Sequence, residues 1–296
     1  RRNGYRPQTT SYDYDAALDE AGRPSRKFPL FRDVIARHRP GVALPEPPAP
    51  APVIAIRRFP LGQSVSLVAS GLLGTPVRAK QPQTFEALGV AFGYVLYRTH
   101  LAGPAQGQLV LGGLRDYAVV TLGGHVVGTL DRRLRQDSLA LSVPARGATL
   151  DVLVENTGRI NFGRDLVHDW KGLTGDVTFA GGTVSGWEMF RLPMEDLRAV
   201  RFGRSAAAAG APPTLYRGTF TLTDVGDTWL DLRGWGKGVV WVNGHNLGRF
   251  WDIGPQRTLF VPGPWLRRGE NTVVVLDLVP RGSYSLEGLS GALFDR

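Results

Sequence analysis

The stretch VVWVNGH, residues 239–245, carries the strongest signal for the fold. Its β-branched and aromatic residues favour a strand, and the Asn-Gly pair that follows favours a tight turn. The same order occurs earlier as VVTLGGH, residues 119–125, where Gly-Gly takes the turn position. A strand followed by a turn and a returning strand is therefore predicted at both places.

Two further segments repeat at nearly the same offset. The segment LYRT at 96–99 matches LYRG at 215–218, and the apolar run at 148–154 matches the run at 271–277. The offset is about 120 residues, the length of one β-sandwich. We infer an internal duplication, and we predict a mainly β fold with two antiparallel, jelly-roll-like sandwiches at 80–195 and 210–296.

The region before the first sandwich has a different character. Phe28, Phe31, Val34 and Ile35 recur at helical spacing, which predicts a helix over 25–38 with Ser25 as its N-cap. This apolar face needs a partner that so short a segment cannot supply. Residues 39–52 are rich in proline and predict an extended spacer, and residues 53–67 are expected to add a strand to one of the sandwiches.

Composition excludes several classes of protein. The chain has 296 residues, a net charge of +9 and no cysteine, so it has neither disulfides nor thiolate metal sites. Its basic residues are nearly all arginine and are scattered beside acidic residues, which argues against nucleic-acid binding. It has no apolar run of about 18 residues, so no membrane span is expected. The compartment stays open: bacterial cytoplasm and secretion both fit.

Few groups suggest catalysis or cofactor binding. The densest acidic stretch consists of Asp13, Asp15, Asp19 and Glu20, which lacks the pattern of a calcium loop and is expected to be a hydrogen-bonded loop. The histidines lack metal-ligand spacing, and no serine lies in a nucleophile elbow. No metal and no cofactor are predicted.

Aromatic and polar residues gather in the second half of the chain. Sugars stack on aromatic faces, and asparagine or arginine can bind their hydroxyls, whereas tryptophan in a strand also serves as core. Contact with a sugar or another domain and internal packing therefore both remain open for this group. Its members are Trp235, Trp241, Asn243, Asn246, Arg249 and Trp251.

Several long motifs resemble glycoside hydrolase family 35, the β-galactosidases. Residues 10–22, TSYDYDAALDEAG, are similar to the family's segment at the last strand of its catalytic barrel, with Ala17 where the family usually has proline. Residues 234–251 are similar to the family's C-terminal galactose-binding-like sandwich, and residues 93–98 and 153–163 also resemble family segments. The resemblance covers nearly the whole chain in order.

The resemblance implies a division into four parts. These are a remnant of a (β/α)8 barrel at 1–40, a proline-rich linker with a connecting strand at 41–76, a first β-sandwich at 77–198 and a second, galactose-binding-like sandwich at 199–296. The family's two catalytic glutamates lie on earlier barrel strands, and no position here matches them. Tyr12 and Tyr14 are the residues implied to touch the substrate.

The function implied is that of a β-galactosidase, a retaining glycosidase that releases terminal β-D-galactose. This chain would represent its C-terminal part, with a β-galactoside and an upstream barrel domain as partners, and it is expected to be inactive alone. The alternative is a stand-alone carbohydrate-binding or structural accessory module. A barrel strand and helix at the start favour the first interpretation.

Overall fold

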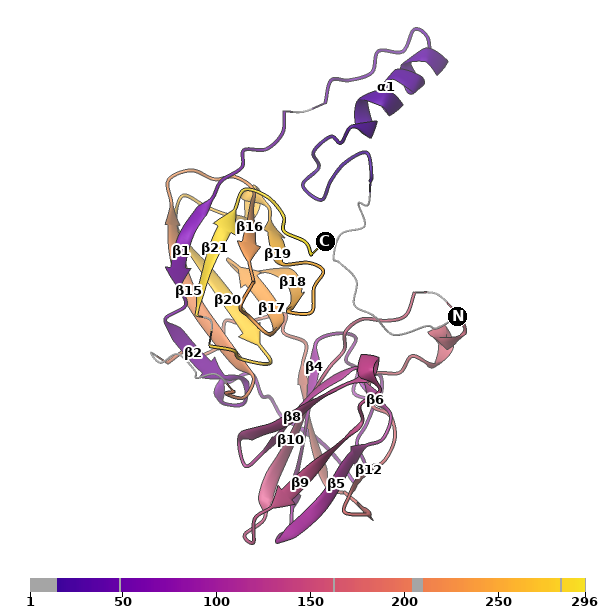
Figure 1. Ribbon diagram of the computed structural model, residues 1–296, viewed down its shortest axis with the longest axis vertical. Coiled ribbons are helices and arrows are strands. Elements are labelled where there is room, and N and C mark those ends of the chain that lie inside the picture. Colours follow the sequence, from indigo (N-terminus) through magenta and orange to yellow (C-terminus); the bar gives the residue numbers. More distant parts are fainter. Residues whose placement is uncertain (1–14, 48, 162, 204–209, 283, 296) are drawn as a thin grey trace. The chain divides into compact units, whose positions relative to one another are not determined.

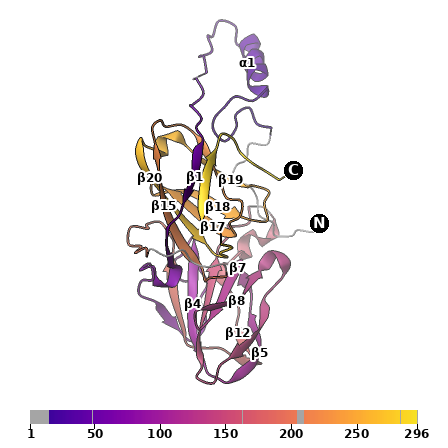
Figure 2. The same cartoon turned by 60° about the vertical axis from the view of Figure 1, so that its left-hand side comes forward.

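The computed structural model describes residues 15–47, 49–161, 163–203, 210–282 and 284–295. These residues divide into two compact units, and most of their strands are labelled in Figures 1 and 2. Unit 1 contains residues 65–203 and 210–214, and unit 2 contains residues 15–64 and 215–295. Unit 2 is thus assembled from segments that lie on both sides of unit 1 in the sequence.

Unit 1 is a β-sandwich of two main sheets. One sheet has the strand order β3-β14-β4-β10-β7-β8 and the other β13-β12-β5-β9, while β6 and β11 form a separate pair. The strands are β3 (Val77–Ala79), β4 (Tyr94–Leu101), β5 (Ala105–Leu111), β6 (Leu114–Arg115), β7 (Tyr117–Leu122), β8 (His125–Asp131), β9 (Ser138–Val143), β10 (Ala148–Glu155), β11 (Gly172–Leu173), β12 (Val177–Phe179), β13 (Gly182–Thr183) and β14 (Trp187–Leu192).

The core of unit 1 lies between its two main sheets. Side chains alternate along a strand, so Val95 and Tyr97 of β4 point into the core, whereas His100 is exposed. Leu109 and Leu111 of β5 meet them from the opposite sheet and are fully buried. The facing side chains of the two sheets thus form one core between them, as in an antiparallel sandwich.

Unit 2 has the same construction. Its sheets have the strand orders β18-β17-β20-β15-β2 and β1-β21-β16-β19. The strands are β1 (Ile56–Pro60), β2 (Gln63–Ser66), β15 (Thr214–Leu222), β16 (Thr228–Asp231), β17 (Lys237–Val242), β18 (His245–Trp251), β19 (Thr258–Val261), β20 (Gly269–Asp277) and β21 (Ser285–Leu289). The predicted mainly β fold with antiparallel sandwiches is confirmed.

The strand orders of the two units correspond element by element. The order β4-β10-β7-β8 in unit 1 matches β15-β20-β17-β18 in unit 2, and β12-β5-β9 matches β21-β16-β19. The register of each hairpin shifts at the same place, between Val120 and Thr121 in one and between Val240 and Trp241 in the other. A shared topology with a shared bulge is the outcome that an internal duplication predicts.

The hairpin turns also correspond. Gly123 and Gly124 have φ angles of 58° and 84°, and Asn243 and Gly244 have φ angles of 50° and 87°. Two successive residues with positive φ form the turn that matches the twist of antiparallel strands, and glycine or asparagine adopts this conformation most readily. The turn chemistry therefore explains why these residues follow each apolar strand.

The segment predicted to add a strand to a sandwich contributes two strands, both to unit 2. Strand β1 pairs with β21, and β2 joins the edge of the five-stranded sheet beside β15. The stretch predicted as a linker with one connecting strand, residues 41–76, thus includes parts of both sheets of unit 2. The division into four sequential domains stays a prediction.

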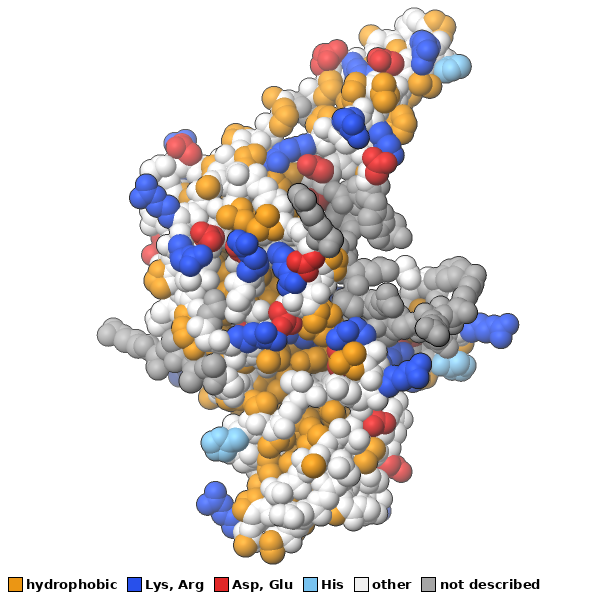
Figure 3. All heavy atoms as spheres, viewed as in Figure 1, with side chains coloured by type: hydrophobic (Ala, Val, Ile, Leu, Met, Phe, Trp, Pro, Cys, Tyr) orange, Lys and Arg blue, Asp and Glu red, His pale blue; other side chains and the backbone are white. Residues whose placement is uncertain are grey.

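Helix α1 (Lys27–His38) begins two residues later than predicted, and its N-cap is Arg26 rather than Ser25. The Ser25 hydroxyl accepts a hydrogen bond from the backbone N–H of Lys27 at 3.2 Å. No residue of the helix is buried, and Phe31, Val34 and Ile35 are about half exposed, as the orange side chains over α1 in Figure 3 illustrate. The apolar face thus has no cover from the described residues. No helix among those residues is both long and apolar enough to cross a bilayer.

Candidate functional site

The six aromatic and polar residues singled out in the sequence belong to two environments in unit 2. Trp235 and Trp241 are 1% and 3% exposed. The Trp235 ring lies edge-on to Tyr216 at 5.3 Å and to Phe250 at 6.4 Å, and its indole N–H donates to the Ser285 carbonyl. Burial on all sides is what core packing requires, and it leaves neither ring a face for a ligand.

Asn243 is tied into the turn between β17 and β18. Its Nδ2 group donates to the Trp265 carbonyl and to Oδ1 of Asn271, each at 2.8 Å. Its Oδ1 accepts from the backbone N–H of Thr272 at 3.0 Å. These bonds hold a side chain whose backbone already has a positive φ, so the turn accounts for the asparagine.

The other three residues lie on β18 and reach the surface. Asn246 is exposed, and its Oδ1 accepts from the backbone N–H of Gly248 at 2.7 Å. Arg249 is exposed, and Trp251 is partly exposed. The ammonium group of the buried Lys237 lies 4.3 Å from the centre of the Trp251 ring, within the range of a cation–π contact.

The acidic stretch before α1 consists of carboxylates with separate partners. Asp15 pairs with Lys27 at 2.6 Å, and Asp19 accepts from two backbone N–H groups of its own turn. Glu20 accepts a hydrogen bond from the indole N–H of Trp229 at 2.7 Å. Asp13, Tyr12 and Tyr14 lie outside the described residues. Among the described residues, no three acidic, cysteine or histidine side chains are grouped as metal ligands.

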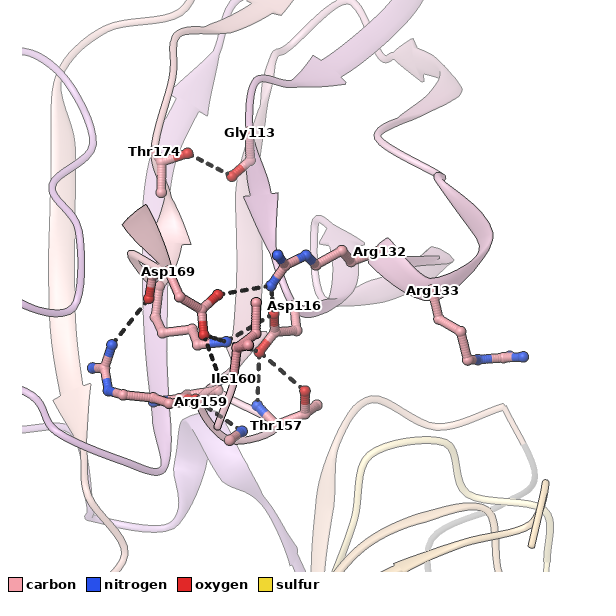
Figure 4. A network of polar contacts seen from close by, with 12 residues as sticks. Gly113, Asp116, Arg132, Arg133, Thr157, Arg159, Ile160, Asp169 and Thr174 are labelled. Carbon is pink, nitrogen blue, oxygen red and sulfur yellow. Dashed lines mark hydrogen bonds and ion pairs between the residues drawn. The ribbon is translucent and has the colours of Figure 1, made fainter. Parts of the chain in front are cut away.

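Unit 1 contains a buried network of four charged side chains, shown in Figure 4. The Lys171 ammonium is completely buried and lies 2.9 Å from Asp116 and 3.1 Å from Asp169. The Arg132 guanidinium lies 2.7 Å from Asp116 and 3.1 Å from Asp169. Two cations thus share two carboxylates, and both carboxylates are at most 3% exposed.

Backbone and hydroxyl groups complete this network. The backbone N–H and the hydroxyl of Thr157 both donate to Asp116 at 3.0 Å, and the N–H of Ile160 donates to Asp169 at 2.9 Å. Arg159 donates to the Asp169 carbonyl and pairs with Glu86 at 2.7 Å. A buried charge needs both a counter-ion and hydrogen bonds, and these groups supply them.

The network fixes an irregular connection between two strands. Residues 156–171 join β10 to β11, and their described part contains a single short 3-10 helix at Arg164–His168. Both ends of this connection are tied to Asp116, through Thr157 and through Lys171. Its middle carries exposed apolar side chains: Leu166 and Trp170 are each 51% exposed and Val167 is 72% exposed. A connection anchored near both ends therefore presents an apolar surface, defined here as the 166–170 surface.

The ion pairs of this network do not follow from which charged residues are adjacent in the sequence. Asp131 and Arg132 are adjacent, but Arg132 bonds Asp116, while Asp131 pairs with Arg133 at 3.0 Å. The network was missed in the sequence because its members are up to 55 residues apart. One signal was present: in a chain rich in arginine, lysine occurs only at Lys27, Lys80, Lys171 and Lys237. Lysine carries a compact charge with three donors, and Lys171 uses it on both buried carboxylates.

The network shifts the pKa of Asp169. Burial raises this pKa, but the Ile160 N–H and the charges of Lys171 and Arg132 outweigh burial, so the pKa lies below its ordinary value. In unit 2, burial raises the pKa of Asp277 above its ordinary value, although it accepts hydrogen bonds from the backbone N–H groups of Val279, Gly236 and Lys237. The two carboxylates are thus shifted in opposite directions.

These opposite shifts predict opposite contributions to stability. The Asp169 contribution is present above the ordinary aspartate pKa of about 4 and is lost as the pH falls through the lower, folded-state pKa. The Asp277 contribution is present at low pH and is lost as the pH rises through its raised, folded-state pKa. We expect Asp169→Asn and Asp277→Asn to change the slope of unfolding free energy against pH with opposite signs. Urea titrations between pH 3 and 7 measure both slopes, and equal slopes in both variants would contradict this prediction.

The family is decided by two matches that follow one another along the chain. Residues 82–193 match the family "Beta-galactosidase, first all-beta domain", and residues 213–271 match "Beta-galactosidase, galactose-binding domain". The chain belongs to the β-galactosidase family, as its C-terminal portion. The first match contains the whole buried network of unit 1, and the second contains all six aromatic and polar residues discussed above.

Curated β-galactosidases give the same result over nearly the whole chain. A β-galactosidase from Xanthomonas manihotis is 46% identical over 87% of this chain and 42% of its own length. A β-galactosidase from Bos taurus is 38% identical over 93% of this chain and 46% of its own length, and one from Homo sapiens is 35% identical over 93% and 44%. The chain therefore spans less than half the length of these relatives.

Among solved structures, a lectin from Pleurotus ostreatus matches 80% of this chain and 81% of its own at 13% identity, with a TM-score of 0.22. A similarity of this size carries no argument about function.

Proposed function

We propose that this chain is the non-catalytic part of a retaining β-galactosidase and takes part in the release of terminal β-D-galactose when a catalytic barrel is joined to it. The observation that carries the proposal is the match to two β-galactosidase domains in their family order. The length of the relatives, more than twice the matched part, leaves room for a barrel.

We propose further that the chain alone does not hydrolyse galactosides. A retaining glycosidase needs two carboxylic groups about 5–5.5 Å apart, one as acid and base and the other as nucleophile. Two buried carboxylates of unit 1, Asp116 and Asp169, are paired with Lys171 and Arg132 and also accept hydrogen bonds from Thr157 and Ile160. Asp15, Asp19 and Glu20 in unit 2 each serve a local contact.

The 166–170 surface is the contact that we propose for the barrel. Apolar side chains exposed on a rigid connection favour burial against another protein surface. The buried network anchors this connection through Thr157 and Lys171, and such a restraint before binding reduces the entropy lost on docking. We propose the barrel as the partner because the Xanthomonas manihotis relative matches most of this chain, and more than half of that relative lies outside the match.

Sugar contacts are proposed at two places. Tyr12 and Tyr14, by family resemblance, would touch the galactose from the rim of the barrel. Asn246, Arg249 and Trp251 are the members of the second group at the surface of unit 2, and their donors and ring suit a sugar. The name of the matching galactose-binding domain favours a second candidate function, a carbohydrate-binding module that acts without a barrel.

The test is hydrolysis of a nitrophenyl β-galactoside. We expect no activity above buffer from the chain alone, and activity when it is co-purified with the barrel domain of the Xanthomonas manihotis relative. A barrel without its two catalytic glutamates is the control and is expected to be inactive in the same complex. Tyr14→Phe is expected to lower turnover in the active complex without changing the yield of the complex.

Two outcomes would contradict the proposal. Robust hydrolysis by the chain alone would mean that a catalytic pair lies within it. A barrel that is fully active and does not bind the chain would remove the accessory role. Calorimetric titration of the chain with galactose then tests the second candidate function, which fails if no binding is detected.

A further inference from the structure

An open groove crosses the outer face of the six-stranded sheet of unit 1, away from the network of Figure 4. Its volume is about 730 Å³, and it lies over β3, β14, β4 and the start of β10. Its floor is Gly186, where an added Cβ would meet no atom within 4 Å. The missing side chain at this point creates the depression.

Strand register places the groove's polar residues in two rows. The N–H of Gly186 bonds the Lys80 carbonyl at 3.1 Å, and Thr149 pairs with His100, so Lys80, Gly186, His100 and Thr149 form one row. The second row lies two residues further along each strand. In this row Glu188 of β14 is opposite Arg78 of β3 on one side and opposite Arg98 of β4 on the other. Side chains two residues apart share a face of a sheet, so both rows face the groove.

The charges of the groove do not cancel. Glu188 pairs with Arg78 at 2.8 Å, and Asp151 binds Arg98 through two bonds of 2.7 and 2.8 Å. Lys80 and His100 form neither a salt bridge nor a side-chain hydrogen bond within the described part of the chain. The three cations Arg78, Arg98 and Lys80 therefore face two carboxylates. The positive charge in excess is that of Lys80, which lies beside Gly186.

The arginines keep donors for a ligand. Arg98 uses Nε and Nη2 on Asp151, and Arg78 uses Nε and Nη2 on Glu188. Because a guanidinium has five N–H donors, the Nη1 group of each remains for a second acceptor. Planar carboxylates and tetrahedral oxyanions are the groups that such donors bind well, and sulfate is a tetrahedral oxyanion like phosphate.

Size and shape indicate what carries that anion. A groove of this volume falls in the range of about 300–1,000 Å³ that holds organic ligands, and it is far larger than one inorganic anion requires. Neutral sugars are bound mainly by stacking on aromatic faces, but the tryptophan of the groove, Trp187, is only 1% exposed and donates its N–H to Val184. Recognition here must rest on charge and hydrogen bonds, which the hydroxyls of Thr149 and Ser185 supplement.

We propose that this groove is a binding site for an acidic oligosaccharide, with an anionic substituent of the sugar held between Lys80 and His100 above Gly186. The site is separate from the galactose-binding domain and needs no barrel. It would bring a chain of sugars that carries carboxylate or sulfate groups to the protein, beyond the single terminal galactose of the proposed reaction.

The test is calorimetric titration of the full chain at low salt with tri-galacturonate, with neutral galactotriose and acetate as parallel ligands. We expect tri-galacturonate alone to bind, and added salt to weaken it. Lys80→Glu and His100→Glu are each expected to weaken binding at least about tenfold, because each removes a hydrogen-bond donor to the anion and places a negative charge beside it. A sulfated galactose trisaccharide distinguishes a requirement for carboxylate from one for any anion.

The control matched to Lys80→Glu is Arg198→Glu, which also replaces a cation by an anion. Arg198 belongs to unit 1 and lies outside the groove. This variant is expected to bind like the parent, and unchanged melting temperatures show that all three variants fold. The proposal is overturned if galactotriose binds as well as tri-galacturonate, if Lys80→Glu and Arg198→Glu weaken binding equally, or if no trisaccharide binds. If acetate or sulfate binds as tightly as the trisaccharides, the groove is a site for small anions, and the proposal that it recognises a saccharide is refuted.

Discussion

Replacing Lys171 by methionine is expected to lower the free energy of unfolding of unit 1 by about 3–5 kcal/mol, the range for breaking a buried ion pair by removing one partner. The substitution keeps roughly the length of the side chain but removes the ammonium that Asp116 and Asp169 share, while the Arg132 guanidinium stays beside both. Both carboxylates are at most 3% exposed, so water cannot replace the lost ammonium. Urea unfolding with hydrogen exchange at residues 156–171 measures the loss and its location.

Two further variants separate this cause from a simple loss of packing. Lys171→Met combined with Asp169→Asn is expected to be less destabilised than the sum of the single changes, because both act on one network. Arg198→Met removes an exposed partner of Asp196 and is expected to leave the melting temperature unchanged. If Lys171→Met is as stable as the parent, the network does not hold the 166–170 surface, and its proposed role in docking fails with it.

Replacing Trp235 by alanine is expected to destabilise unit 2 by about 3–5 kcal/mol, the usual cost of removing a large buried aromatic residue. The ring is 1% exposed and lies edge-on to Tyr216 and Phe250. Its removal creates a cavity between the rings and leaves the Ser285 carbonyl without the indole N–H. Trp241→Ala is expected to have an effect of similar size because Trp241 is 3% exposed.

Trp251→Ala is the matched control for these core variants. This ring is partly exposed and contacts Lys237, so its loss is expected to cost clearly less than the loss of Trp235. Because the chain has two units, hydrogen exchange must show that the loss of protection falls on residues 215–295. Equal losses for Trp251→Ala and Trp235→Ala would contradict the assignment of Trp235 to the core.

Patterns confined to a few residues proved the most predictable. The β-branched and aromatic residues of two strands and the Asn243-Gly244 and Gly123-Gly124 turns indicated hairpins at β17–β18 and β7–β8, and the structure has both. The repeat at about 120 residues indicated two similar sandwiches, and their strand orders correspond. Helix α1 and its exposed apolar face were equally visible, because helical spacing is read within a few turns.

The candidate site was less predictable for a physical reason. The same pattern of aromatic and polar residues fits both a sugar site and a core, and only the packing of other strands buried Trp235 and Trp241 while leaving Asn246 at the surface. Strands β1 and β2 also join unit 2 across more than 100 intervening residues, and the local sequence carries no trace of that pairing.

By itself, the sequence determined the fold class, the internal repeat and the family resemblance. Each of them can be recognised from short stretches of residues and the order in which these stretches occur. Only the tertiary structure decided which charges meet. Lys171 and Asp116 are 55 residues apart in the sequence, and they form an ion pair only when folding brings them together and removes both from water. The groove over Gly186 arises in the same way, because a surplus of charge on one sheet face depends on the register of four strands.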